Sequence, residues 1–250
     1  MLRCVSVVAC AAFSLVLTTS THAQIPQRWN GPYIGANIGH GSADIGGSLT
    51  VFDQGGKTLD GPAGYGIDAD GMFGGIQAGF NRRIGSFFVG LEADLQTADI
   101  SGSTSFGSKS FTYSASASMD WFATARVRAG FATDAVLVYA TGGLAFGNVD
   151  LNATYKSSNG TAHLSSSDTH VGLVLGAGVE FALRSNWSLK LEYQYLNFGS
   201  QSAEDAFFWE YCDKIYGKNV STDFDTDIHT LRIGLNYAFG AQPRHEPLKP

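Results

Sequence analysis

The segment His229-Thr-Leu-Arg-Ile-Gly-Leu-Asn-Tyr-Ala-Phe239 carries the pattern that decides the fold prediction. Its odd-numbered residues from Leu231 onward are apolar, and its even-numbered residues from Thr230 onward are polar or small. Side chains alternate between the two faces of a strand, so this segment has one apolar face and one polar face. Its length and alternation predict a tilted strand that crosses a hydrocarbon layer with the apolar face toward lipid.

Seven earlier segments are predicted as strands, and all but 135–148, which is apolar on both sides, show a similar alternation. The eight predicted strands are 29–40, 72–83, 87–96, 121–131, 135–148, 171–181, 187–195 and 229–239. Short turns alternate with long stretches rich in Gly, Ser and Asp, which we predict to be loops at 41–71, 98–118, 150–167 and 199–226. The fold class expected is all-β: an eight-stranded antiparallel up-and-down transmembrane β-barrel with short periplasmic turns and four long extracellular loops.

The start of the chain predicts export from the cytoplasm. Arg3, an apolar core and a small-residue site ending at Ala23 are typical of a secretory signal peptide, so we assign residues 1–23 to it. The barrel domain is then 24–239, followed by a short Pro-rich periplasmic tail at 240–250. Without the leader the chain has 15 basic and 22 acidic residues, a net charge of −7 that argues against nucleic acid as a partner.

A soluble, lipocalin-like barrel is the alternative to a membrane barrel, because period two does not say which face points inward. The signal peptide, the long connections on one side and a charged content of only 15% favour the membrane barrel. Aromatic residues near the strand ends also favour it, since such residues form girdles at the two membrane interfaces. The predicted girdle consists of Trp29, Tyr33, Trp121, Phe131, Trp187, Phe198 and Phe239.

Several motifs together resemble the small porin-like outer-membrane β-barrel proteins of alphaproteobacteria. They include Trp29-x-Gly-x-Tyr33-Ile-Gly, Val89-Gly-Leu-Glu-Ala-Asp94, Ala125-Arg-Val-Arg-Ala-Gly-Phe131 and Trp187-Ser-Leu-Lys-Leu-Glu-Tyr193, and the resemblance covers residues 29–239. It implies an outer-membrane protein concerned with envelope integrity and surface interactions, without a shared catalytic residue. Members commonly end on the aromatic residue that the assembly machinery reads, whereas here 240–250 follow Phe239.

The polar face of the predicted strands carries four acidic and four basic residues. They are Glu92, Asp94, Arg126, Arg128, Glu180, Lys190, Glu192 and Arg232. Charges removed from bulk water persist when they are paired, so we expect an ion-pair network that braces the lumen. The alternative is the selectivity lining of a narrow pore, but side chains just fill an eight-stranded barrel.

Two groups of residues in the predicted loops are candidates for binding or catalysis. Aromatic residues in the fourth loop are candidates for surface contact: Phe207, Phe208, Trp209, Tyr211 and Tyr216. A lipid-modifying enzyme built on His163, Ser166, Asp168 and His170 is the third alternative, but no nucleophile elbow or metal-spaced histidine pair supports it. We therefore expect no catalytic residue, metal site or cofactor.

The function expected is that of a structural outer-membrane protein, with a narrow porin as the alternative. The expected partners are outer-membrane lipids and lipopolysaccharide and the barrel-assembly machinery. Peptidoglycan and a host surface are further candidates.

Overall fold

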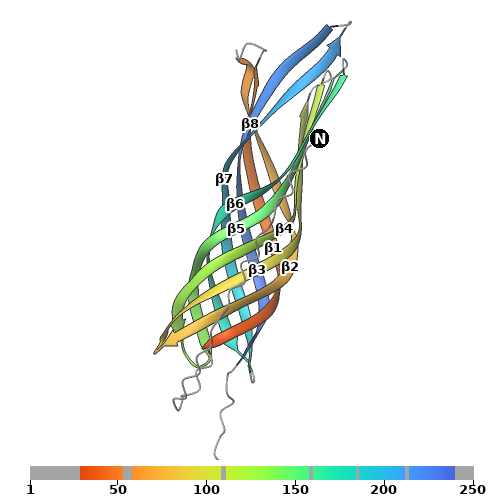
Figure 1. Cartoon of the computed structure of the whole chain (residues 1–250). Coiled ribbons are helices and arrows are strands. Elements are labelled where there is room, and N and C mark those ends of the chain that lie inside the picture. The colour runs from red at the N-terminus through yellow and green to blue at the C-terminus, as the bar shows by residue number, and fades with distance from the viewer. Residues whose placement is uncertain are drawn as a thin grey trace, which may run out of the picture.

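The chain folds into a closed antiparallel barrel in which β1 pairs with β8 to complete the ring (Figure 1). In this computed structural model the described residues are 29–52, 58–107, 111–157, 160–183, 186–211 and 214–239. The strands are β1 (Gly31–Phe52), β2 (Thr58–Ile84), β3 (Phe87–Gly107), β4 (Phe111–Ala132), β5 (Val136–Ser157), β6 (Gly160–Ala182), β7 (Trp187–Tyr211) and β8 (Lys214–Ala238). The eight-stranded antiparallel barrel predicted from the alternation is confirmed.

The predicted signal peptide, residues 1–23, and the predicted tail, 240–250, lie outside the described residues. Both stay predictions. Across the described ranges, no helix is long and apolar enough to cross a membrane.

The alternation seen in the sequence sets which side chains face outward. On β2, Ile76 is 66% exposed, whereas the adjacent Gln77 is 3% exposed and points into the barrel. The same holds for β8, where Leu231 is exposed and Arg232 is buried. The assignment of apolar residues to the outward face is therefore correct.

The stretches predicted as long loops are mostly continuations of the strands, so that prediction is wrong for the described residues. β1 runs on to Phe52 and β2 already begins at Thr58, which leaves 53–57 between them. The other predicted loops likewise reduce to 108–110, 158–159 and 212–213. These stretches still bury alternate side chains, such as Ala43 and Ile45 of β1, but the inward residues are few and often small, and they stand among Gly, Ser and Asp. The apolar alternation is therefore too weak to mark a strand.

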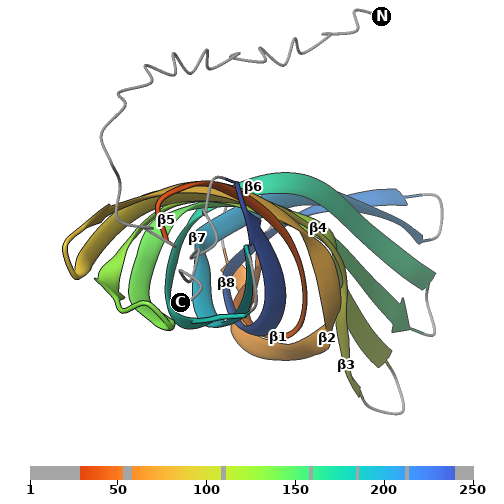
Figure 2. The ribbon, with the colours of Figure 1, turned by 90° about the horizontal axis from the view of Figure 1, so that it is seen from below.

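The barrel wall divides beyond the lipid-facing part of the strands, on the side away from the tight turns. Among the described residues, pairing of β6 with β7 stops at Leu173–Asn197, and pairing of β2 with β3 stops at Ala69–Gly102. The strands beyond these points form two separate four-stranded sheets, β7–β8–β1–β2 and β3–β4–β5–β6. Figure 1 shows the strands continuing upward beyond the closed part of the barrel, and Figure 2 shows the ring from the end with the tight turns.

Irregularities in strand pairing lie close to this division. In β4 the register shifts between Ser118 and Phe122, and Asn148 Oδ1 of β5 accepts hydrogen bonds from the backbone amides of Asp120 and Trp121 at 3.2 and 3.1 Å. In β7 the pairing with β8 shifts after Asn197. Bulges of this kind bend a strand and increase its twist, which fits the change of direction here.

Candidate functional site

The most distinctive part of the molecule is a charged layer across the middle of the lumen. It brings together all eight charged residues selected from the sequence, with side chains between 0 and 3% exposed. They come from five strands, β3, β4, β6, β7 and β8, and all occupy inward positions of the alternation. Four carboxylates face four cationic groups, so the layer is neutral. We call these eight residues the ion-pair layer.

Glu92 lies at the centre of the ion-pair layer. Its carboxylate accepts hydrogen bonds from Lys190 Nζ at 2.6 Å, from Arg128 Nη1 at 3.0 Å and from Arg126 Nη2. Tyr33 Oη of β1 also donates to Glu92 Oε2, at 2.6 Å. One carboxylate therefore links strands on opposite sides of the barrel.

Glu192 and Asp94 both accept hydrogen bonds from the guanidinium groups of Arg126 and Arg232. Glu192 Oε1 accepts from Arg126 Nη1 at 2.7 Å and from Arg232 Nη2 at 2.5 Å. Asp94 Oδ2 accepts from Arg126 Nη2 at 2.8 Å, from Arg232 Nη2 at 3.2 Å and from Thr124 Oγ1 at 2.8 Å. Sharing each charge among several partners offsets the cost of removing it from water.

Arg128 is held between two tyrosine rings. Its guanidinium carbon lies 3.9 Å from the centre of the Tyr139 ring and 5.6 Å from that of Tyr33. Arg128 also donates to Glu180, whose other oxygen accepts from Ser188 at 3.2 Å. Stacking and hydrogen bonding together account for a guanidinium that has no exposed surface.

Two glycines make room for these tyrosines. Tyr33 pairs across strands with Gly79, and Tyr139 pairs with Gly178. A Cβ atom at Gly79 would lie 2.4 Å from Tyr33 Oη, and one at Gly178 would lie 2.5 Å from Tyr139 Oη. The narrow lumen can hold a large ring only where the facing residue has no side chain, which explains part of the high glycine content.

Apolar clusters lie on both sides of the ion-pair layer, and the sequence interpretation missed them. Toward the tight turns lie Trp29, Phe88, Ala132, Leu137 and Tyr139. Toward the opposite end lie Ala43, Ala69, Phe73, Ile100, Met119, Phe122, Ala145, Val149, Val174, Leu196, Phe198 and Ile228. The signal was available, because Phe88 and Phe122 occupy inward positions in the alternation.

The structure places the seven residues of the predicted aromatic girdle on both faces of the barrel wall. Phe131, Trp187 and Phe239 are outward and 68%, 43% and 46% exposed, and Trp121 is half-buried on the outward face. Three members were placed wrongly and point inward: Trp29, Tyr33 and Phe198 are 6%, 4% and 2% exposed. Tyr33 and Phe198 have inward parity in their strands, and Trp29 instead donates its indole N–H to the Thr133 carbonyl at 2.7 Å. An aromatic residue near a strand end is thus not by itself a girdle residue.

The candidates for surface contact and for catalysis fall mostly outside what is described. The side chains of Phe207, Phe208, Trp209, Tyr211 and Tyr216 lie outside the described residues, as do those of His163 and Ser166. Asp168 is exposed and His170 is half-buried on β6. Within the described residues, no three His, Cys, Asp or Glu side chains are arranged to hold a metal ion.

Comparison with known proteins agrees with the motif resemblance. The chain matches the family model described as outer membrane protein beta-barrel domain over residues 9–239. It is 34% identical over 218 residues to the 31 kDa outer-membrane immunogenic protein of Brucella melitensis biotype 1, covering 84% of each chain. It is 27% identical over 209 residues to the 22 kDa outer membrane protein of Rhizobium leguminosarum bv. viciae, covering 84% of this chain and 78% of that one.

Among solved structures, the outer membrane protein OprG of Pseudomonas aeruginosa aligns with a TM-score of 0.45 at 13% identity, over 86% of this chain and 100% of that chain. The family match spans most of the chain, and the Brucella relative exceeds 30% identity over most of both chains. The chain therefore belongs to the outer membrane protein beta-barrel domain family and is a protein of the outer membrane.

Proposed function

We propose that the protein is a non-conducting structural barrel that supports the envelope and carries two extended sheets on the cell surface. The observation that carries this proposal is the filled lumen, in which a neutral ion-pair layer lies between apolar clusters. Ions crossing it would have to displace paired charges and then pass apolar side chains. We propose no enzymatic role, because the contacts of the ion-pair layer and the apolar clusters include no activated nucleophile and no group of metal ligands.

The outward face supports the membrane-anchoring part of the proposal. Large apolar side chains are exposed around the barrel, among them Ile38 on β1, Leu91 on β3 and Leu175 on β6. Such a belt would be costly in water and is suited to outer-membrane lipid. We propose membrane lipids, including lipopolysaccharide, as the partners of this belt.

The divided upper wall supports the surface-interaction part. Among the described residues, the ladder between β6 and β7 ends at the Leu173–Asn197 pair, so above it these two strands are not paired with each other. Unpaired strand edges can add an extended segment of another polypeptide through backbone hydrogen bonds. The Brucella relative is named as an immunogenic outer-membrane protein, which fits a family member whose outer sheets are exposed on cells.

Epitope insertion tests this arrangement. We expect a short epitope placed in 53–57 or 212–213 to be bound by antibody on intact cells. The same epitope between Gly85 and Ser86, in the tight turn after β2, should be bound only after the outer membrane is permeabilised. Antibody binding to the Gly85 insertion on intact cells, with none at 53–57, would reverse the orientation and contradict the proposal.

A narrow porin is the second candidate, and the ion-pair layer is the feature that favours it, since charged side chains also line selective pores. It requires the layer and both apolar clusters to open together. Single-channel conductance of the folded barrel separates the two.

A further inference from the structure

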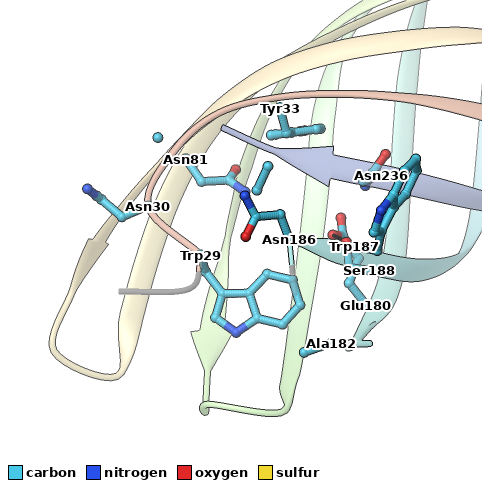
Figure 3. Close-up of a pocket in the computed structure, with 12 residues that line it drawn as sticks. Trp29, Asn30, Tyr33, Asn81, Glu180, Ala182, Asn186, Trp187, Ser188 and Asn236 are labelled. Atoms are coloured by element: carbon cyan, nitrogen blue, oxygen red, sulfur yellow. Dashed lines mark hydrogen bonds between the residues drawn. The ribbon is translucent and has the colours of Figure 1, made fainter. Parts of the chain in front are cut away.

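The chain turns into the barrel just before its first strand. Trp29 precedes β1 and is only 6% exposed, with its ring inside the lumen at the end that carries the tight turns. Gly31 has a φ of 113°, a backbone conformation that residues with a Cβ rarely adopt, and it allows the change of direction. Figure 3 shows the Trp29 ring near Ala182 of β6, with the Asn30 side chain pointing the other way. Trp29 therefore reaches into the lumen instead of continuing the wall.

The Trp29 side chain connects the start of β1 to the opposite wall of the barrel. Its indole N–H donates to the Thr133 carbonyl, in the turn between β4 and β5, at 2.7 Å. These two residues are 104 positions apart in the sequence. The other members of its apolar cluster come from β3, β4 and β5, and they are Phe88, Ala132, Leu137 and Tyr139.

The turn between β4 and β5 presents the Thr133 carbonyl as a fixed acceptor. In many tight turns the carbonyl of the first residue accepts from the amide three residues later. Here the Val136 amide donates to Thr133 Oγ1 at 3.0 Å, and the Thr133 amide donates to the Val136 carbonyl at 2.8 Å. The hydroxyl thus takes the place of the carbonyl within the turn, and the carbonyl is available to Trp29.

Two further contacts fix the start of β1 between its neighbouring strands. On one side, Asn30 Oδ1 accepts from the Arg83 amide at the end of β2, at 3.3 Å. On the other side, the Phe239 amide after β8 donates to the Pro32 carbonyl at 2.9 Å. Because the backbone is held on both sides, the indole of Trp29 has a defined direction across the lumen.

The contact between Trp29 and Thr133 depends on closure of the ring. β1 and β8 are the two ends of the sheet, and their pairing completes the barrel. In an open, flat sheet β2 and β3 would separate β1 from β4 by about 14 Å, because neighbouring strands lie about 4.8 Å apart. The indole reaches the turn between β4 and β5 only when the sheet has curled and closed.

We propose that Trp29 is a latch, formed after β1 has paired with β8, that locks the closed barrel. A ring that opened in the membrane would expose unpaired backbone groups of β1 and β8 to lipid, which is costly. Interactions that are absent from the folding transition state slow unfolding and leave the folding rate unchanged. The latch therefore has a kinetic signature that a contact formed early in folding would lack.

The test measures folding and unfolding rates of the protein in lipid vesicles with urea, followed by heat-dependent gel mobility. We expect Trp29→Ala to unfold at least about tenfold faster, because truncation of a buried tryptophan is among the most costly core changes. Its folding rate should change by no more than about twofold. Trp29→Phe keeps an aromatic ring but loses the N–H donor, so its unfolding rate should lie between those of Trp29→Ala and the unaltered protein.

Trp187→Phe is the matched control, because Trp187 lies at the same end of the barrel but points outward and is 43% exposed. Both of its rates should stay within about twofold of those of the unaltered protein. Unaltered unfolding of Trp29→Ala, folding slowed as much as unfolding is accelerated, or failure of both Trp29 variants to fold would each overturn the proposal. Equal acceleration in Trp29→Phe and Trp187→Phe would also overturn it, since the effect would then belong to any tryptophan at this end of the barrel.

Discussion

Glu92 shows how much of the fold depends on single residues inside the lumen. Three cationic side chains, Lys190, Arg126 and Arg128, donate to its carboxylate, which has no exposed surface. The inward position of Glu92 could be predicted from the alternation around it. The partners could not, because pairing across a barrel depends on strand tilt and on register between strands that are distant in sequence.

Replacing Glu92 by Gln should be strongly destabilising. The change keeps the size of the side chain but leaves an excess positive charge among buried groups, which costs about 3–5 kcal/mol. Urea unfolding in lipid vesicles measures the change in free energy of unfolding. Asp99→Asn on the same strand is the control, since Asp99 is exposed and should change stability by no more than about 0.5 kcal/mol. Equal stability of the two variants would contradict the role assigned to the ion-pair layer.

Gly178 tests the space that the tyrosines need. In Gly178→Ala the new Cβ would lie 2.5 Å from Tyr139 Oη, so the ring must shift away from Glu192, to which its hydroxyl donates. We expect a loss of about 1–3 kcal/mol in the free energy of unfolding. Gly46→Ala has open space around the new Cβ and should leave stability unchanged or slightly higher. Tolerance of alanine at both glycines would disprove the steric argument.

At the level of the elements, each strand is longer than the segment in which apolar residues alternate with polar ones. Alternation of large apolar residues identifies the lipid-facing part of each strand, but it is lost where Ser, Thr and Gly replace them, as in the Ser101–Ser105 part of β3. That part still pairs with β4, for example Ser103 with Ser116. The high Ser and Gly content of these stretches therefore led to a loop prediction where the backbone hydrogen-bond ladder in fact continues. The bulges near Trp121 and Asn197 could not be predicted, because no sequence pattern marks them.

The bulge in β4 should depend on Asn148. Its side-chain oxygen accepts from two consecutive backbone amides, so Asn148→Ala leaves Asp120 and Trp121 without these partners. We expect faster hydrogen exchange at those two amides and a loss of about 1–3 kcal/mol, measured by NMR of the refolded barrel. Asn152→Ala, an exposed asparagine on the same strand, should leave both exchange rates unchanged. Unaltered exchange in Asn148→Ala would show that the bulge holds without its cap.

At the level of the whole molecule, the interior is a stack of layers. Apolar side chains lie next to the tight turns, the ion-pair layer crosses the middle, and a larger apolar cluster follows. The charged layer could be predicted by listing the inward residues of each membrane strand. The larger apolar cluster could be predicted only in part, at members such as Phe122, because others, such as Ala43 and Ile100, fall in segments that showed no alternation.

The central claim is that this stack closes the barrel to ions. The most direct test is single-channel recording of refolded residues 24–250 in a planar lipid bilayer, with heat-dependent gel mobility showing that the barrel has folded. The account predicts inserted, folded protein with no unitary conductance steps. Stable, reproducible steps that change with charge reversal at Arg126 or Glu192 would contradict it and would establish the narrow porin instead.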